Sequence, residues 1–133
     1  MRRLSAENKY NSQKTACQFG HLHDSKKEAR RCGELHIMQQ AGLISGLEIQ
    51  KKYELIPAQY IETGEFYKKG DKIGQSKLKE IERACCYVAD FVYTQNGIKY
   101  IEDCKGHRTK DYIIKRKLMR YRFCDDKTLF IET

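Results

Sequence analysis

Changes in the spacing of apolar residues divide the chain into predicted helices and strands. Apolar positions at helical spacing in residues 25–41 predict one buried helix face, formed by Ala29, Cys32, Leu35 and Met38. Ser25 and, three positions later, Glu28 form a capping box, which is typical of the first turn of a helix. Gly42 suits the position just after the last turn. A helix is therefore predicted between Ser25 and Gly42.

Alternation of apolar and polar residues predicts four strands, at 47–55, 83–93, 98–105 and 128–132. Pro57 ends the first of them, because proline cannot donate to a strand ladder. A small hairpin is predicted around Gly20. Residues 59–82 hold three glycines and many lysines, and they predict a long charged loop or a hairpin excursion.

A second helix is predicted over 109–123, with Ile114, Leu118 and Tyr121 on its apolar face. The order helix, three strands, helix, strand predicts an α/β domain with a mixed central sheet flanked by helices. At 133 residues the chain fits one domain. We expect residues 1–14 to be a basic flexible arm and residues 15–133 to be that domain.

The dipeptide Asn96-Gly97 is a strong signal for a hairpin with a two-residue turn. Such a turn places Asp90 directly opposite Asp103 on one face of the sheet, with Cβ atoms about 4.5–5.5 Å apart. Lys105 shares that face, because side chains alternate with a period of two.

Two facing carboxylates destabilise a sheet unless something offsets their repulsion. A divalent cation would do so, and oxygen ligands favour Mg²⁺ or Mn²⁺. Three alternatives stay open: a solvated face on which two acids happen to align, a proton shared between them, and a longer loop that shifts the register. The apolar neighbours Val88, Phe91, Val92 and Ile101 favour the cation site over a solvent-exposed hairpin on which the acids have no function.

The net charge of +8 is concentrated at the two ends of the chain, around a slightly acidic middle. Such a distribution favours a polyanionic partner such as DNA. Residues 105–122 hold eight Lys and Arg residues and one acid. The predicted contacts to the phosphate backbone are Lys110, Lys115, Arg116, Lys117 and Arg120, although for any single one of them a solvated helix face is the better explanation.

The chain has six cysteines, no apolar N-terminal signal and no run long enough to span a membrane. These features predict an intracellular, cytoplasmic protein with reduced, buried thiols. The nearest zinc candidates are Cys17, His21, His23 and Cys32. Their spacing fits no common zinc finger, so core packing of the cysteines and solvation of the histidines are predicted instead.

Four separated segments resemble, in order, a small phage-type family of the PD-(D/E)XK nuclease superfamily that is similar to Holliday junction resolvases. They are LHDSKKEARR, LEIQKKYELIP, YVADFVY and IEDCKGHRTKDYIIKRKLMRY, within about residues 10–132. Asp90 followed by Asp103-x-Lys105 matches the motif. The resemblance implies a restriction-endonuclease-like core of order αβββαβ. Two departures are Asp103, where many relatives have glutamate, and the long excursion at 59–82.

The resemblance also implies roles for individual residues. Glu28, Asp90, Asp103 and the Cys104 carbonyl would hold Mg²⁺, with Mn²⁺ as a substitute. Lys105 would position the attacking water or stabilise charge on the phosphate. Gln50 would orient Glu28 or a water molecule.

The implied activity is metal-dependent endonucleolytic hydrolysis of DNA, on branched substrates, by a phage or prophage protein in a bacterial host. Symmetric cutting of a junction needs two sites and favours a homodimer, but no interface is legible in the sequence. The alternative is a non-catalytic nucleic-acid-binding protein of the same fold, and a second rival is a structural or assembly protein.

Overall fold

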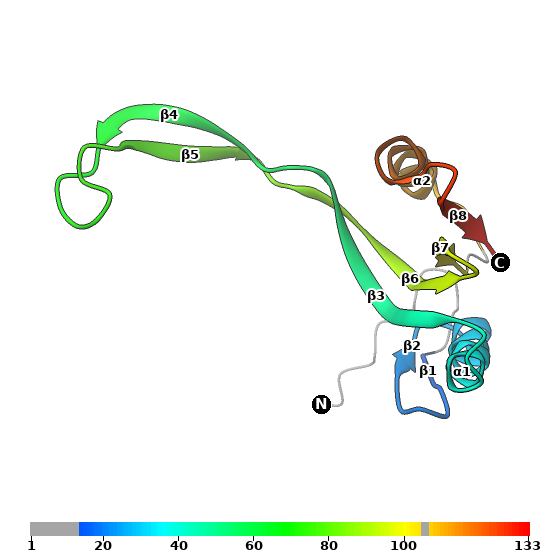
Figure 1. Ribbon diagram of the computed structural model, residues 1–133. Coiled ribbons are helices and arrows are strands. Elements are labelled where there is room, and N and C mark those ends of the chain that lie inside the picture. Colours follow the sequence, from blue (N-terminus) through cyan, green and yellow to red (C-terminus); the bar gives the residue numbers. More distant parts are fainter. Residues whose placement is uncertain (1–13, 105–106) are drawn as a thin grey trace, which may run out of the picture.

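The computed structural model describes residues 14–104 and 107–133. Its centre is a four-stranded sheet in the order β3-β6-β7-β8 (Figure 1). The first three strands run antiparallel and β8 pairs parallel to β7. The bounds are β3 (Ser45–Ile56), β6 (Cys85–Gln95), β7 (Ile98–Asp103) and β8 (Thr128–Glu132). The predicted mixed α/β sheet is thus confirmed.

Two helices, α1 (Lys26–Gln40) and α2 (Lys110–Phe123), pack against the sheet through separate apolar clusters. Phe91 belongs to the cluster of α1 and its neighbour Val92 to the cluster of α2. Because consecutive strand residues point to opposite faces, the two helices cover opposite faces of the sheet. Neither described helix is long and apolar enough to cross a membrane.

The predicted ends of α1 are confirmed. The Ser25 hydroxyl accepts a hydrogen bond from the backbone N–H of Glu28 and caps the helix. After the last turn, Gly42 has a φ of 76°, which glycine adopts without steric cost. Three of the predicted core positions (Ala29, Cys32 and Leu35) are buried, and Met38 is half-buried.

The predicted apolar face of α2 is wrong in part. Ile114 and Tyr121 are 58% and 86% exposed, whereas Leu118 is half-buried against the core. The buried residues are Tyr112 and Met119, which lie two turns apart. Between them on the inner side is Arg116, which pairs with Glu132 of β8. The hydrophobic pattern could not predict that a charged residue, Arg116, would lie on the inner face of α2.

The charged excursion is a hairpin. Strands β4 (Gln59–Phe66) and β5 (Ser76–Glu82) pair only with each other and project away from the sheet as a two-stranded ribbon (Figure 1). The predicted small hairpin around Gly20 is also present, as β1 (Thr15–Ala16) and β2 (Leu22–His23). Residues 1–13, which hold most of the predicted basic arm, lie outside the described residues.

The hairpin between β6 and β7 has the predicted register. Its pairs run from Gln95 with Ile98 to Phe91 with Glu102, so the turn holds two residues and the alternative of a longer loop is excluded. Asn96 and Gly97 have φ values of 51° and 78°, as a type I′ turn requires. Continued by one step, this register brings Asp90 of β6 to Asp103 of β7.

Candidate carboxylate site

Three predicted metal-ligating carboxylates are buried in the fold. Glu28 on α1 is 5% exposed, Asp90 on β6 is 9% exposed and Asp103 at the end of β7 is 1% exposed. Burial of a carboxylate is costly unless the group is hydrogen-bonded, paired or bound to a metal. The burial of these acids excludes the alternative of a solvated face.

Asp90 lies where the ladder between β6 and β7 ends. The backbone N–H of Cys104 donates to Asp90 Oδ2 at 2.8 Å, and Gln50 Nε2 lies 3.4 Å from Asp90 Oδ1. Gln50 has a φ of 56°, which is rare for a residue with a side chain. The predicted partner of Gln50 was Glu28 or a water molecule, whereas the observed one is Asp90.

The strained backbone at Gln50 coincides with a change of face in β3. Ile49 packs in the cluster of α1, and Tyr53 and Leu55 pack in the cluster of α2. The same change occurs in β6 between Ala89 and Phe91, which lie on the two sides of Asp90. Strict alternation would keep each strand on one face, so this irregularity is what brings a polar pair into the middle of two apolar strands.

Asp103 is held from the α2 side of the sheet. The Tyr87 hydroxyl donates to Asp103 Oδ2. Burial raises the pKa of Tyr87 well above its usual range, and the charges of Asp103 and, more weakly, Asp90 raise it further. Both carboxylates therefore act on one buried phenol, which places them in the same neighbourhood.

Glu28 combines a capping position with a buried carboxylate. Its Oε2 atom lies 3.0 Å from His23 Nδ1 and accepts a weaker bond from the backbone N–H of Asp24 at 3.3 Å. The Glu28 carboxylate thus accepts from the backbone N–H of Asp24 and not from that of Ser25, so the capping box is only half formed. Its other half is present, because the Ser25 hydroxyl accepts a hydrogen bond from the backbone N–H of Glu28. Within the described residues Glu28 Oε1 makes no hydrogen bond.

Cys104 is a common neighbour of this group of acids. Burial raises the pKa of its thiol to about 11, and the charges of Glu102, Asp90 and Glu28 contribute to the rise. Asp90 binds the backbone N–H of Cys104, Asp103 directly precedes Cys104 in the chain, and the charge of Glu28 acts on its thiol. The three acids are neighbours rather than a closed cage, because their oxygens do not all lie within 4.8 Å of one another.

A buried ion pair beside the site was missed by the sequence analysis. Arg31 on α1 holds Glu102 with two bonds of 2.8 Å, from Nε to Oε2 and from Nη2 to Oε1. The Tyr93 hydroxyl donates to the same carboxylate at 3.0 Å, and burial together with Glu102 raises the pKa of Tyr93 to about 12. The hydrogen bond to Glu102 raises the pKa of Arg31 still further above its usual range.

A cavity of about 330 Å³ adjoins Cys104, and its lining residues are Lys27, Arg30, Arg31, Glu34, Cys104 and Thr133. The basic members come from α1, which sequence reasoning did not consider as a contact surface. A signal was available in SKKEARR: Lys27, Arg30 and Arg31 are spaced three and four apart and so share one helix face.

The predicted DNA contacts on α2 do not all face solvent. Lys110, Lys117 and Arg120 are exposed and Lys115 is half-buried. Arg116 is largely enclosed and lies 3.0 Å from Glu132, while Arg120 lies 4.0 Å from the same carboxylate. Lys105, the predicted catalytic lysine, lies outside the described residues.

The fold and the buried acids define a mixed α/β domain with a carboxylate cluster at the end of its central hairpin. The chain belongs to the family described as "Protein of unknown function (DUF1064)", whose model matches residues 7–133. No curated protein and no solved structure matches the chain.

Proposed function

We propose that the protein is a metal-dependent endonuclease of the PD-(D/E)XK type, which hydrolyses phosphodiester bonds in DNA. The observation that carries this proposal is the pair Asp90 and Asp103, which are both buried and which the β6–β7 register, continued one step beyond Phe91 and Glu102, places opposite each other beside Cys104. The order α1, β3, β6, β7, α2, β8 is consistent with the αβββαβ core of that superfamily, once the β4–β5 ribbon is set aside as an insertion.

The donor set fits a hard divalent cation. Glu28, Asp90, Asp103 and the Cys104 carbonyl offer only oxygen, which Mg²⁺ and Mn²⁺ prefer. When bound, such a cation lowers the pKa of a coordinated water and offsets charge on the phosphate. A carboxylate that accepts a hydrogen bond at one oxygen still has lone pairs for a cation, so the bonds to Tyr87 and Cys104 are compatible with this role.

The protein's own residues hold the acids in place. Tyr87 fixes Asp103, and the Cys104 N–H with Gln50 fixes Asp90. Such support keeps ligands within the narrow geometry that catalysis requires. Lys105 follows directly after Cys104, and we assign it the positioning of the attacking water or the stabilisation of charge on the phosphate.

DNA would be held through its backbone. Lys27 and Arg30 of α1 line the cavity beside Cys104, and Lys110, Lys117 and Arg120 form a separate basic surface on α2, on the opposite face of the sheet. Contacts of this kind carry little sequence information and weaken as salt rises. Branched DNA is the substrate class that the sequence resemblance favours, and two protomers would be needed to cut a junction symmetrically.

A second candidate is a nucleic-acid-binding protein without catalysis. The observation in its favour is that Asp90 and Asp103 already accept hydrogen bonds from Cys104 and Tyr87, which gives both acids a structural role. In that case the basic surface would bind DNA and the acids would only order the end of the hairpin.

Cleavage assays distinguish the two. Supercoiled, duplex, flap and four-way-junction DNA would be incubated with Mg²⁺, Mn²⁺ or chelator, using the native protein and the Asp103→Asn and Asp90→Asn variants. We expect cleavage only with metal, and a loss of about 100-fold or more in each variant, because the reacting groups lose their positioning. The matched control is Asp125→Asn, an exposed acid whose loss leaves the rate unchanged.

Salt-dependent DNA binding without cleavage under any condition would favour the non-catalytic alternative. Equal cleavage by all four proteins would indicate a contaminating nuclease and remove the enzyme proposal.

A further inference from the structure

Four cysteine and histidine side chains meet between the β1–β2 hairpin and α1, where His23 also contacts Glu28. One ligand atom from each of Cys17, His21, His23 and Cys32 lies within 4.8 Å of the others. Among residues 14–104 and 107–133 no other group of three or more potential ligands is gathered so closely. The prediction of solvated histidines is wrong, since His23 is 1% exposed and His21 is half-buried.

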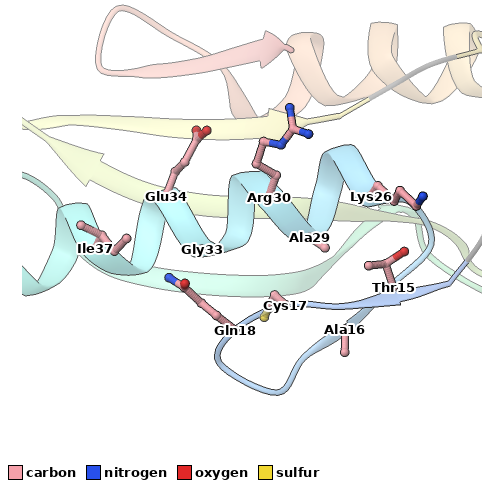
Figure 2. A pocket seen from close by; sticks show the side chains of 10 residues that line it. All are labelled: Thr15, Ala16, Cys17, Gln18, Lys26, Ala29, Arg30, Gly33, Glu34 and Ile37. Carbon is pink, nitrogen blue, oxygen red and sulfur yellow. The ribbon is translucent and has the colours of Figure 1, made fainter.

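The local fold explains the convergence. Cys17 follows β1, His21 and His23 flank Leu22 on the returning strand, and the bond from Cys17 N–H to the His21 carbonyl closes the turn at 2.8 Å. Cys32 faces them from α1. Figure 2 shows Cys17 on the segment beside α1. Strands of two residues cannot hold a hairpin by backbone pairing alone, so this one needs a further anchor.

The spacing of the atoms suits a tetrahedral ion. His21 Nδ1 lies 3.5 Å from Cys17 Sγ and 3.6 Å from Cys32 Sγ. The bond lengths of zinc to sulfur and nitrogen place neighbouring ligand atoms of a tetrahedron about 3.3–3.8 Å apart. The side chains therefore need little movement to take up zinc geometry.

His23 provides an independent indication. Its Nδ1 atom is 3.0 Å from Glu28 Oε2, while its Nε2 atom is buried and has no hydrogen-bond partner among the described residues. A buried ring nitrogen without a partner is unfavourable, and coordination to a metal removes that cost. A metal-binding histidine usually donates its second N–H to a carboxylate, which is the relation between His23 and Glu28.

The two thiols lie together at the same place. Cys17 and Cys32 are both buried, and each Sγ lies beside His21 Nδ1. A zinc ion bound between the two sulfur atoms would stabilise both as thiolates.

We propose that Cys17, His21, His23 and Cys32 form a structural zinc site that fastens the β1–β2 hairpin to α1. With all four ligands from the protein and no position left for water, the site is of the closed, non-catalytic kind. Its sulfur and nitrogen donors select zinc, in contrast to the oxygen donors around Asp90. Zinc on Nε2 of His23 fixes the tautomer that donates from Nδ1 to Glu28, so the site also positions that carboxylate.

The test is metal content together with cobalt substitution, on the full chain. Protein expressed with added Zn²⁺ and passed over gel filtration is expected to hold one zinc ion per chain by mass spectrometry of metals. Replacement by Co²⁺ is expected to give the visible bands of tetrahedral coordination and the near-ultraviolet band of thiolate-to-cobalt charge transfer. Cys17→Ser and Cys32→Ser are expected to lose both signals.

Two further variants keep the test decisive. His21→Asn changes a half-buried ligand and reports on the site should a cysteine variant fail to fold. Cys86→Ser, which removes a thiol on β6 that is not part of the cluster, is expected to retain zinc and the cobalt spectrum.

The proposal is overturned if the native protein binds no stoichiometric zinc, or if Cys17→Ser and His21→Asn bind it as well as the native chain. A Cys17–Cys32 disulfide as the dominant species in the intact mass would also overturn it. None of these results depends on nuclease activity.

Discussion

The central sheet and the β4–β5 ribbon are formed in part by the same two chain segments, yet they differ in what they bury. β3 runs on into β4 and β5 into β6 (Figure 1), so one pair of chain segments forms both. In the sheet, acids such as Glu102 and Asp103 are completely enclosed. In β4 every residue is exposed, including Ile61 and Phe66. The sheet therefore encloses charged side chains in its interior, whereas the side chains of β4 need no core to cover them.

Burial of polar groups, rather than strand pairing, is thus what distinguishes the end of the molecule where we propose the site. Each buried acid in the sheet has a specific neighbour: Arg31 for Glu102, Tyr87 for Asp103 and Cys104 for Asp90. Charged residues of the ribbon, by contrast, are solvated. Substitutions in the two regions should consequently differ sharply in effect.

The largest effect on stability is expected for Arg31→Met. It leaves Glu102 buried without its cation, and breaking a buried pair typically costs about 3–5 kcal/mol. Arg31→Met combined with Glu102→Leu should recover much of the loss, because the uncompensated charge is gone. Urea denaturation followed by circular dichroism measures both. Equal stability of Arg31→Met and native protein would contradict the comparison.

A smaller effect is expected from Glu132. Burial opposes its ionisation, but hydrogen bonds from Tyr112 and Arg116 lower its pKa in the folded protein. A lowered folded pKa contributes stability above the unfolded value of about 4.3, and this is lost as pH falls through the folded pKa.

Native protein should therefore exceed Glu132→Gln by about 2 kcal/mol near pH 7, as for bonds to a charged group, and the gap should close below the folded pKa. Denaturation at a series of pH values gives this difference. A gap that persists unchanged into acid would mean that Glu132 is not held by these bonds.

The smallest effect is expected from removal of the ribbon. Ile56 and Cys85 are paired, so replacing residues 57–84 by Asn-Gly should close the sheet with a two-residue turn. The stability of the shortened protein should stay within about 0.5 kcal/mol of the native value, as for surface changes. Unfolding of the shortened protein at ambient temperature would show that the ribbon supports the core.

Most of the fold was predictable because its signals are local. Ser25 and Gly42 delimit α1, Asn96-Gly97 fixes the hairpin register, and alternation locates β3. The inner face of α2 was not predictable in this way, because Arg116 lies on that face and pairs with Glu132, whereas the hydrophobic pattern predicts only apolar residues there. Burial of an arginine depends on Glu132, whose position follows from tertiary structure alone.

The candidate site was likewise predictable only where it depends on local sequence. Asp90 and Asp103 follow from the turn, whereas the link from Gln50 to Asp90 depends on a positive φ that no sequence pattern announced. The residues Cys17, His21, His23 and Cys32 were recognised as zinc candidates but set aside because their spacing matches no common motif. Only the packing of a short hairpin on α1 brings them together.

The most direct test of the central claim is binding of Mn²⁺ to the carboxylate site, measured by electron paramagnetic resonance of free Mn²⁺ in protein previously loaded with zinc. The account predicts saturable binding that Mg²⁺ displaces, that Asp103→Asn and Asp90→Asn abolish and that Asp125→Asn leaves intact. Thermal unfolding would confirm that each variant is folded. Folded Asp103→Asn protein that binds Mn²⁺ as tightly as the native chain would contradict the account.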